Sequence, residues 1–393
     1  MIDGNGVVLY RVAGDLLPSL SPKERFRSAR YRELEYDLII TGSCRETATR
    51  LNRIRLQDDG AKPTTVRNHA EREGESLQAT MVARASGTFA EHGFGADGHK
   101  APETEIDFSE AKKKTANPEI ASQVSQKIGV LAVCGDYEAT GAAVNISIDE
   151  VCCKRQTSQR NQDAEKAKEP KQVRNTVVHV QKGNMDYILV GATITEAVRL
   201  LLGFLLANNL LGAYPLTFFA DAAKSIKNTV AEYFGFAPYR YILDWPHLAK
   251  KSAELLSSAI KGKDKRNEVH EEVKKRLWLG DVNAAVDFLD AIPVEHIKSA
   301  NWLTALRDYL DKNRESIPCY AARKELGLRN SSNLGEKAND RVVSSRQKHN
   351  GMSWSKEGSF GLAALSAAHI NNELRDWLHC QSPRFAFRIP GAA

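Results

Sequence analysis

The order of strand-like and helix-like segments from residue 143 onward places the strongest constraint on the fold of this chain. Residues 143–149 alternate apolar and polar side chains, which is the pattern of a half-buried strand, and residues 151–156 can continue this strand or form a return. Further strand segments follow at 173–181 and 185–190. Helical periodicity then begins at residue 194. Three strands at such short spacing predict an antiparallel meander at the start of a sheet.

The segments after the meander alternate between helix and strand. They are a helix at 194–206, a strand at 215–221, a helix at 224–234, a strand at 239–244 and a helix from residue 247. In this series the first and fourth strands are expected to be parallel neighbours. The order is typical of an α/β fold with a ribonuclease-H-like mixed sheet.

The length of 393 residues suggests two or three structural units. We expect, in chain order, a helical region at 1–78, a linker at 79–140, the first part of the ribonuclease-H-like core at 141–250, an all-helical insertion at 251–327 and the final helices of the core at 328–393. The insertion is predicted because no convincing strand pattern occurs in that stretch.

Two short helices are expected in the N-terminal region, at 45–54 and from residue 63, and together they outline a helix-turn-helix at about 45–73. In that motif the second helix lies in the DNA major groove. Its first turns carry side chains that can contact phosphates and base edges, namely Thr64, Thr65, Arg67 and Asn68. The turn is longer than usual for the motif, so an amphipathic helical pair with solvated charges is an equally good interpretation.

Composition limits the functional classes. Lys and Arg outnumber Asp and Glu by 55 to 49, and the resulting net charge of +6 permits a polyanionic partner. The six cysteines form no C-x-x-C pair, which argues against a disulfide scaffold and a zinc finger. The longest apolar stretch, around Leu200–Leu211, is too interrupted to span a bilayer, and residues 1–4 do not begin a signal peptide. We therefore expect a cytoplasmic protein with no membrane partner.

Two of the predicted strands end in an acidic residue, Asp149 and Asp221, and a third acid, Glu336, lies on a later helix. Ligand sites of open α/β sheets lie at the carboxyl ends of parallel strands, where the first two acids would meet. Neighbouring carboxylates repel each other unless a cation neutralises them, and Mg²⁺ prefers oxygen ligands. The three acids therefore predict a catalytic site for two divalent ions, Mg²⁺ or Mn²⁺, suited to phosphodiester chemistry.

Each acid also has a purely local interpretation. Asp149 can start a turn, Asp221 can cap the helix that follows it, and Glu336 can form a capping box with Asn333. Metal binding is favoured by the three acids together and by no single one of them.

Other residues are second-rank candidates. Asp244 ends a strand at the same sheet edge and competes with Glu336 as the third acid, and His247 can orient a water molecule or simply begin a helix. The candidates for DNA contacts in the C-terminal part are Arg341, Arg346, Lys348 and Trp354. The alternative for the three basic residues is a solvated helix face, and for the tryptophan it is packing in the core.

Several stretches resemble bacterial insertion-sequence transposases of the DDE class. They are Ile148-Asp149-Glu150, the sequence ADAAKSIK at 220–227, the sequence ILDWPHL at 242–248, and LGEK at 334–337 followed by RQK at 346–348 and GMSWS at 351–355. The last group is the most specific, because it is similar to the branch of these enzymes that has a C-terminal G-M-x-W-S element. The resemblance covers roughly residues 140–380.

The resemblance implies that Asp149, Asp221 and Glu336 form the metal-binding triad of a ribonuclease-H-like enzyme. It implies nicking at transposon ends, attack of the freed 3′-hydroxyl on target DNA, a double-stranded DNA partner, a homodimer or larger assembly, and a bacterial, nucleoid-associated location. Glu150 stands where the family more often has glycine, and Pro246 where it has an aromatic residue. Two alternatives therefore stay open: a DNA-binding protein without catalysis, and a nuclease without strand transfer.

Overall fold

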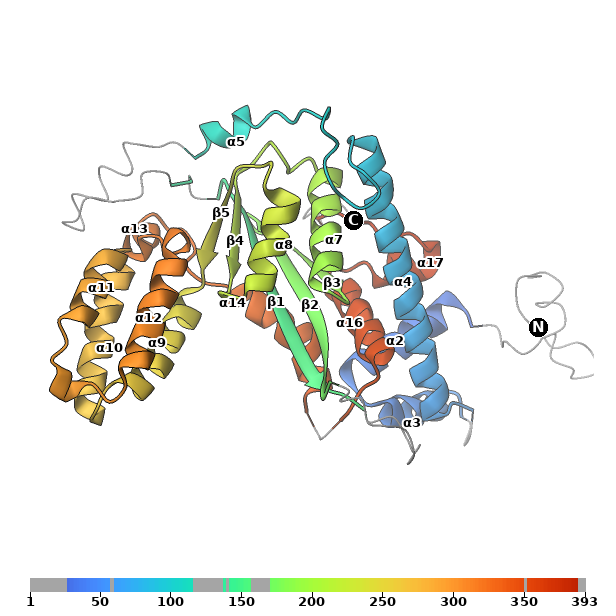
Figure 1. Cartoon of the computed structure of the whole chain (residues 1–393). Helices are drawn as coiled ribbons and strands as arrows, with labels where there is room; N and C mark the ends of the chain where they lie inside the picture. The colour runs from blue at the N-terminus through green and yellow to red at the C-terminus, as the bar shows by residue number, and fades with distance from the viewer. Residues whose placement is uncertain are drawn as a thin grey trace, which may run out of the picture.

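The computed structural model describes residues 27–56, 60–115, 137–138, 141–156, 170–349 and 352–387. Within them the chain forms an α/β fold around one five-stranded mixed sheet with the order β3-β2-β1-β4-β5 (Figure 1). The strands are β1 (Val144–Lys154), β2 (Gln172–Lys182), β3 (Met185–Gly191), β4 (Leu216–Ala220) and β5 (Tyr239–Leu243). No helix in the described ranges is long and apolar enough to cross a bilayer.

The pairing of the strands is the one that the segment order predicted. β1 pairs with β2 and β2 with β3 in antiparallel fashion, whereas β1 with β4 and β4 with β5 are parallel. Of the two possibilities for residues 151–156, the structure shows the continuation, because β1 runs past Asp149 to Lys154 and pairs with β2 over its full length. Asp149 therefore lies inside a strand, and it starts no turn.

Helices cover both faces of the sheet. On one face α7 (Ile194–Ala207) and α8 (Lys224–Phe234) pack against the apolar side chains of the alternating strands. The long helix α4 (Pro63–Glu91) runs along the β3 edge of the sheet and contacts both α7 and α16 (Lys356–Ile370) (Figure 1). On the other face lie α14 (Asn333–Asn339) and α16, whose apolar side chains form a smaller core with β1, β2 and β3. The sheet is thus the middle layer of three.

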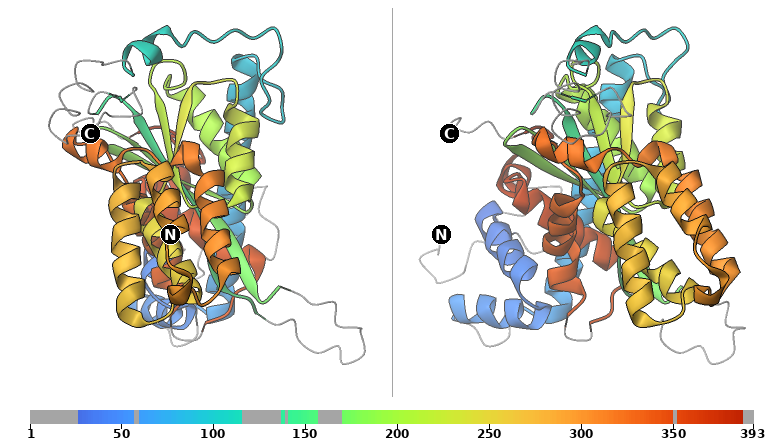
Figure 2. Two further views of the ribbon diagram at one scale, coloured as in Figure 1. Left: turned by 60° about the vertical axis from the view of Figure 1, so that its left-hand side comes forward. Right: turned by 90° about the vertical axis from the view of Figure 1, so that its left-hand side faces the viewer.

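The predicted helical insertion forms a lobe beside β5, which the three views of Figures 1 and 2 show. Its helices are α9 (Trp245–Ala259), α10 (Lys263–Trp278), α11 (Val282–Asp290), α12 (Ala300–Lys312) and α13 (Tyr320–Glu325). The lobe has its own apolar core, which joins the sheet at Phe219, Ile242 and Leu243. Tyr320 fixes the attachment, because its buried hydroxyl donates to the carbonyl oxygen of Leu243 at 2.6 Å.

The N-terminal helices are α2 (Ala29–Thr41), α3 (Cys44–Ile54) and the first half of α4. The predicted boundary at residue 78 is wrong, because α4 is 29 residues long and runs on to Glu91. Its second half carries Met81, Ala85 and Phe89 into the main core, at helical spacing. A short helix, α5 (Ser109–Lys113), follows in the predicted linker, and residues 116–136 and 139–140 of that linker lie outside the described residues.

Hydrogen bonds at the buried carboxylate of Glu73 tie the N-terminal helices to the C-terminal helix α17 (Leu374–Cys380). This carboxylate on α4 accepts from the Tyr36 hydroxyl of α2 at 2.9 Å and from the Trp377 indole of α17 at 2.9 Å. Arg32 of α2 adds an ion pair at 3.3 Å. The helical N-terminal region is therefore part of the main body, and α4 is no isolated recognition helix.

Candidate metal centre

Strand register brings three acidic residues into one row. Ser147 of β1 pairs with Phe219 of β4, so two residues further along Asp149 stands opposite Asp221. Ala220 of β4 pairs with Leu243 of β5, and the next residues are Asp221 and Asp244. Residues at matching positions of parallel strands lie on the same face of a sheet, so all three acids belong to one face. This is the face that α14 covers.

Asp244 is buried and organises the surroundings of the row. Its Oδ2 accepts from the backbone N of His247 at 3.0 Å and from His247 Nδ1 at 2.7 Å, and it caps α9 in this way. Its Oδ1 accepts from the backbone N and the hydroxyl of Ser332 at 2.5 and 3.0 Å. Burial favours a raised pKa for Asp244, but the bonds from His247 and Ser332 outweigh it and hold the pKa below its ordinary value.

His247 faces the acids from the first turn of α9. Its hydrogen bond to Asp244 raises the pKa of His247 above the ordinary value in spite of partial burial, and the charges of Asp244, Asp221 and Asp149 raise it further. With Nδ1 held by Asp244, it is Nε2 that is free to face a ligand. A carboxylate behind a histidine ring is the usual arrangement around metal-binding histidines.

Helix α14 brings Glu336 to this face. Its Gly335 sits directly on β1, since a Cβ atom built on Gly335 would lie 2.6 Å from the Cβ of Ser147. Asn339, one turn later, donates from Nδ2 to Asp149 Oδ2 at 2.6 Å. The bonds between Ser332 and Asp244 fix the start of the same helix. Glu336 is thus held between two anchored points of α14.

The charges of the site act most strongly on Asp149. Burial, together with the negative charge of Asp221, raises the pKa of Asp149 to about 6, and Glu336 adds to this rise. His247 and a backbone hydrogen bond at Glu150 act in the opposite direction. A carboxylate whose pKa is raised by burial and by neighbouring carboxylates, as at Asp149, is the situation that a bound cation relieves.

Asp244, His247 and Glu336 form a group that could hold a metal ion, because each offers a ligand atom and these atoms lie within 4.8 Å of one another. Of the predicted trio, Glu336 belongs to this group, while Asp149 and Asp221 lie beside it, as the register and the effect of these charges on His247 show. Asp244 and His247 were expected only as second-rank candidates, but both belong to this group. Asn339, which follows Glu336 by one helical turn and contacts Asp149, was not among the predicted site residues.

The structure also tests the helix-capping interpretations of Glu336 and Asp221. Glu336 forms no capping box with Asn333, because α14 begins at Asn333 itself and its N-cap is Ser332. Asp221 does not cap α8, whose N-cap is Ala223, but its Oδ1 accepts a local hydrogen bond from the backbone N of Ala223 at 2.9 Å, which leaves its other oxygen available. The Tyr241 hydroxyl also holds the Asp221 carbonyl oxygen at 2.9 Å.

The predicted DNA contacts divide into exposed and buried residues. Thr64, Thr65, Arg67 and Asn68 are exposed on the first turns of α4, and Arg341 and Lys348 are exposed after α14. Arg346 is only 6% exposed, so a contact with a phosphate is wrong for this residue: its Nε donates to the carbonyl oxygen of Ile39 at 3.1 Å.

Trp354 is also a packing residue. Its indole N–H donates to the carbonyl oxygen of Gln347 at 3.1 Å, and its ring lies 5.2 Å from the guanidinium of Arg346. The ring packs against the main core. The packing alternative for Trp354 is therefore confirmed, and because its ring is only partly buried, stacking on an unpaired base stays a prediction.

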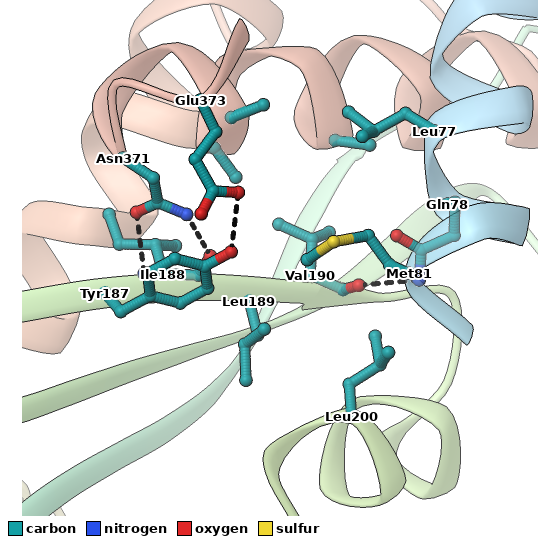
Figure 3. A pocket seen from close by; sticks show the side chains of 13 residues that line it. Leu77, Gln78, Met81, Tyr187, Ile188, Leu189, Val190, Leu200, Asn371 and Glu373 are labelled. Carbon is teal, nitrogen blue, oxygen red and sulfur yellow. Dashed lines mark hydrogen bonds between the residues drawn. The ribbon is translucent and has the colours of Figure 1, made fainter. Parts of the chain in front are cut away.

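A cavity at the junction of β3, α4 and α16 is separate from the acids (Figure 3). It measures about 20 Å³, which is room for one water molecule and too small for a substrate. Asn371 bonds the backbone of Ile188, and the Glu373 carboxylate accepts from the Tyr187 hydroxyl at 2.8 Å. These bonds hold the segment after α16 on the edge strand β3.

Glu373 makes the stability of the protein depend on pH. Burial raises the pKa of Glu373 above its ordinary value, although bonds from Tyr187 and from the backbone N of Phe385 oppose the rise. An acid with a raised pKa in the folded state destabilises that state once it ionises, so stability is lost as the pH rises through this pKa. We expect Glu373→Gln, which cannot ionise, to gain in melting temperature relative to the parent between pH 4 and pH 7. Parallel melting curves that keep a constant separation over this range would contradict the assignment.

Comparison of the chain with protein-family models, with curated proteins and with solved structures found no match. Its function is therefore argued from its own residues.

Proposed function

We propose that this chain is a DDE-class transposase with a ribonuclease-H-like core, which cuts DNA at transposon ends and joins the freed ends to a target. The observation that carries the proposal is the row of Asp149, Asp221 and Asp244 on one sheet face, with Glu336 held over it by α14. The strand order β3-β2-β1-β4-β5, antiparallel on one side of β1 and parallel on the other, supports the fold part of the proposal.

The residues of this site fit divalent cations. Carboxylates that repel one another, a raised pKa at Asp149 and a histidine backed by a carboxylate all favour a bound positive charge. Asp149, Asp221 and Glu336 would hold two ions, Mg²⁺ or Mn²⁺, and His247 Nε2 is available to the same ions. When bound, such ions supply a nucleophile at neutral pH and neutralise the charge that develops on the phosphodiester.

Asp244 acts behind these ligands. Its carboxylate already accepts four hydrogen bonds, which fill its lone-pair sites. It therefore orients the His247 ring and fixes the segment that leads into α14, so that His247 and Glu336 approach each other. The closeness of the Asp244 oxygen to the ligand atoms of His247 and Glu336 follows from this bonding.

An exposed basic surface on α3 and the start of α4 supports DNA as the substrate. It consists of Arg45, Arg50, Arg53, Arg55, Lys62 and Arg67. The first turn of α4 has no side-chain cap, so its backbone N–H groups can also bind phosphate. Thr64, Thr65 and Asn68 stand on the same turns. A homodimer or larger assembly would bring two transposon ends together.

The test is a cleavage and strand-transfer assay with the full chain. The substrates are labelled duplexes that carry the inverted repeats flanking its gene, together with a supercoiled target plasmid. With Mg²⁺ or Mn²⁺ we expect nicks at the repeat ends and joined products, and with EDTA neither. The sequence control is the same labelled duplex with the sequence of its inverted repeats scrambled.

The two alternatives give different results in this assay. Specific, salt-dependent binding of the repeats without any metal-dependent cut would show a DNA-binding protein without catalysis. Nicks without joined products would show a nuclease without strand transfer. Either outcome contradicts the proposed transposase.

A further inference from the structure

Helix α14 brings a second polar side chain to the acids, and it is an amide. Asn339 donates from Nδ2 to Asp149 Oδ2 at 2.6 Å, and the residue is only 7% exposed. We propose that Asn339 is a positioning residue of the metal centre, which fixes the Asp149 carboxylate and presents its own carbonyl oxygen to the hydration shell of the bound cation. This inference rests on the proposed function.

The fit between α14 and β1 holds Asn339 over Asp149. Gly335 lies on Ser147 and Asn339 lies on Asp149. Four residues of helix rise about 6 Å, and two residues of strand about 6.6 Å, so the two contacts match in spacing. Because Gly335 has no side chain, the helix approaches β1 closely enough for the short Asn339 side chain to reach the carboxylate.

The chemistry of an amide suits this position. Its N–H group stabilises the ionised form of Asp149, which burial and Asp221 disfavour. Unlike a lysine or arginine, it adds no positive charge that would compete with a cation. One Asp149 oxygen is engaged by Asn339, and the direction of the other is thereby set.

The carbonyl oxygen of Asn339 gives independent evidence for a ligand. Asn339 Oδ1 is buried and has no hydrogen-bond partner among the described residues. A buried polar atom left without a partner is unfavourable, and a bound water molecule or ion is one of the explanations for it. An amide oxygen is a ligand type that Mg²⁺ and its bound water molecules accept. The π-helical turn Asp340–Ser344, a feature frequent at functional sites, begins at the next residue.

The experiment measures Mn²⁺ binding by calorimetry for the parent chain, Asn339→Leu, Asn339→Ala and the control Asn333→Ala. Leucine has a similar size to asparagine but neither donor nor acceptor. We expect both Asn339 variants to raise the Mn²⁺ dissociation constant about tenfold. Asn333 is exposed at the start of the same helix, and its variant should bind as the parent does.

Melting without metal separates positioning from packing. In Asn339→Leu the removal of an unpartnered buried oxygen offsets the loss of the hydrogen bond to Asp149, so we expect its metal-free melting temperature to stay close to that of the parent while its Mn²⁺ affinity falls. A variant that binds Mn²⁺ as tightly as the parent, or that loses only melting temperature, overturns the inference and leaves the proposed function standing. A parent chain that binds no Mn²⁺ contradicts the proposed function itself.

Discussion

Replacement of Asp149, Asp221 or Glu336 by its amide, one residue at a time, is expected to reduce Mg²⁺-dependent DNA cleavage about a thousandfold. Each amide keeps the size of the side chain but removes a negative charge that the cations need, and the loss of a metal ion removes several kcal/mol of transition-state stabilisation. The three acids lie apart from the exposed basic surface of α3 and α4, so DNA binding should stay within twofold of the parent. Gel-based cleavage and fluorescence anisotropy measure the two quantities.

The matched control for these variants is Asp340→Asn. Asp340 is exposed one residue after Asn339, and its carboxylate belongs to neither the row of acids nor the group around His247. This variant should cut as well as the parent. If the variants of Asp149, Asp221 and Glu336 all cut at the parental rate as well, the row of acids is a structural feature and the proposed function is wrong.

Asp244→Asn separates the two roles that the structure gives to acids. Asparagine at this position has a single carbonyl oxygen, so it can accept hydrogen bonds from His247 or from Ser332 but not from both. Its effect therefore falls on the ring of His247 and on the start of α14. The sequence alone could not assign this role to Asp244, because a strand that ends in Asp has the same pattern whether the carboxylate binds an ion or a histidine. Asp244 was therefore predicted only as an alternative to Glu336.

The fold was largely predictable because local patterns agree with tertiary structure in the sheet. The alternation at 143–149 and the short apolar strands before Asp221 and Asp244 correspond to β1, β4 and β5. The sequence left open whether the first strand continues past Asp149, since the length of β1 is set by its pairing with β2 and not by its own residues alone. Likewise, the residues that neighbour Arg346 in the sequence do not indicate that its guanidinium donates to the distant carbonyl oxygen of Ile39.

Gly74→Ala is expected to destabilise the protein by about 3 kcal/mol, although alanine is the better helix former. Gly74 is the point where α4 crosses α16. A Cβ atom built on it would lie 2.2 Å from the carbonyl oxygen and 2.4 Å from the Cα of Gly361. Both contacts are with backbone, which cannot rotate away, so the two helices must separate and lose the packing between them.

A glycine-to-alanine substitution near the C-terminal end of α4 should change the free energy of unfolding in the opposite direction. A Cβ atom on the exposed Gly87 of α4 meets nothing within 4 Å, so Gly87→Ala should stabilise the protein by roughly 0.5–1 kcal/mol through helix propensity alone. Gly361→Ala is intermediate, because its nearest contact is the Glu71 carbonyl oxygen at 3.1 Å. Urea unfolding of the three variants should give the stability order Gly87→Ala, parent, Gly361→Ala, Gly74→Ala. A Gly74→Ala variant as stable as Gly87→Ala would mean that α4 and α16 do not touch at this point.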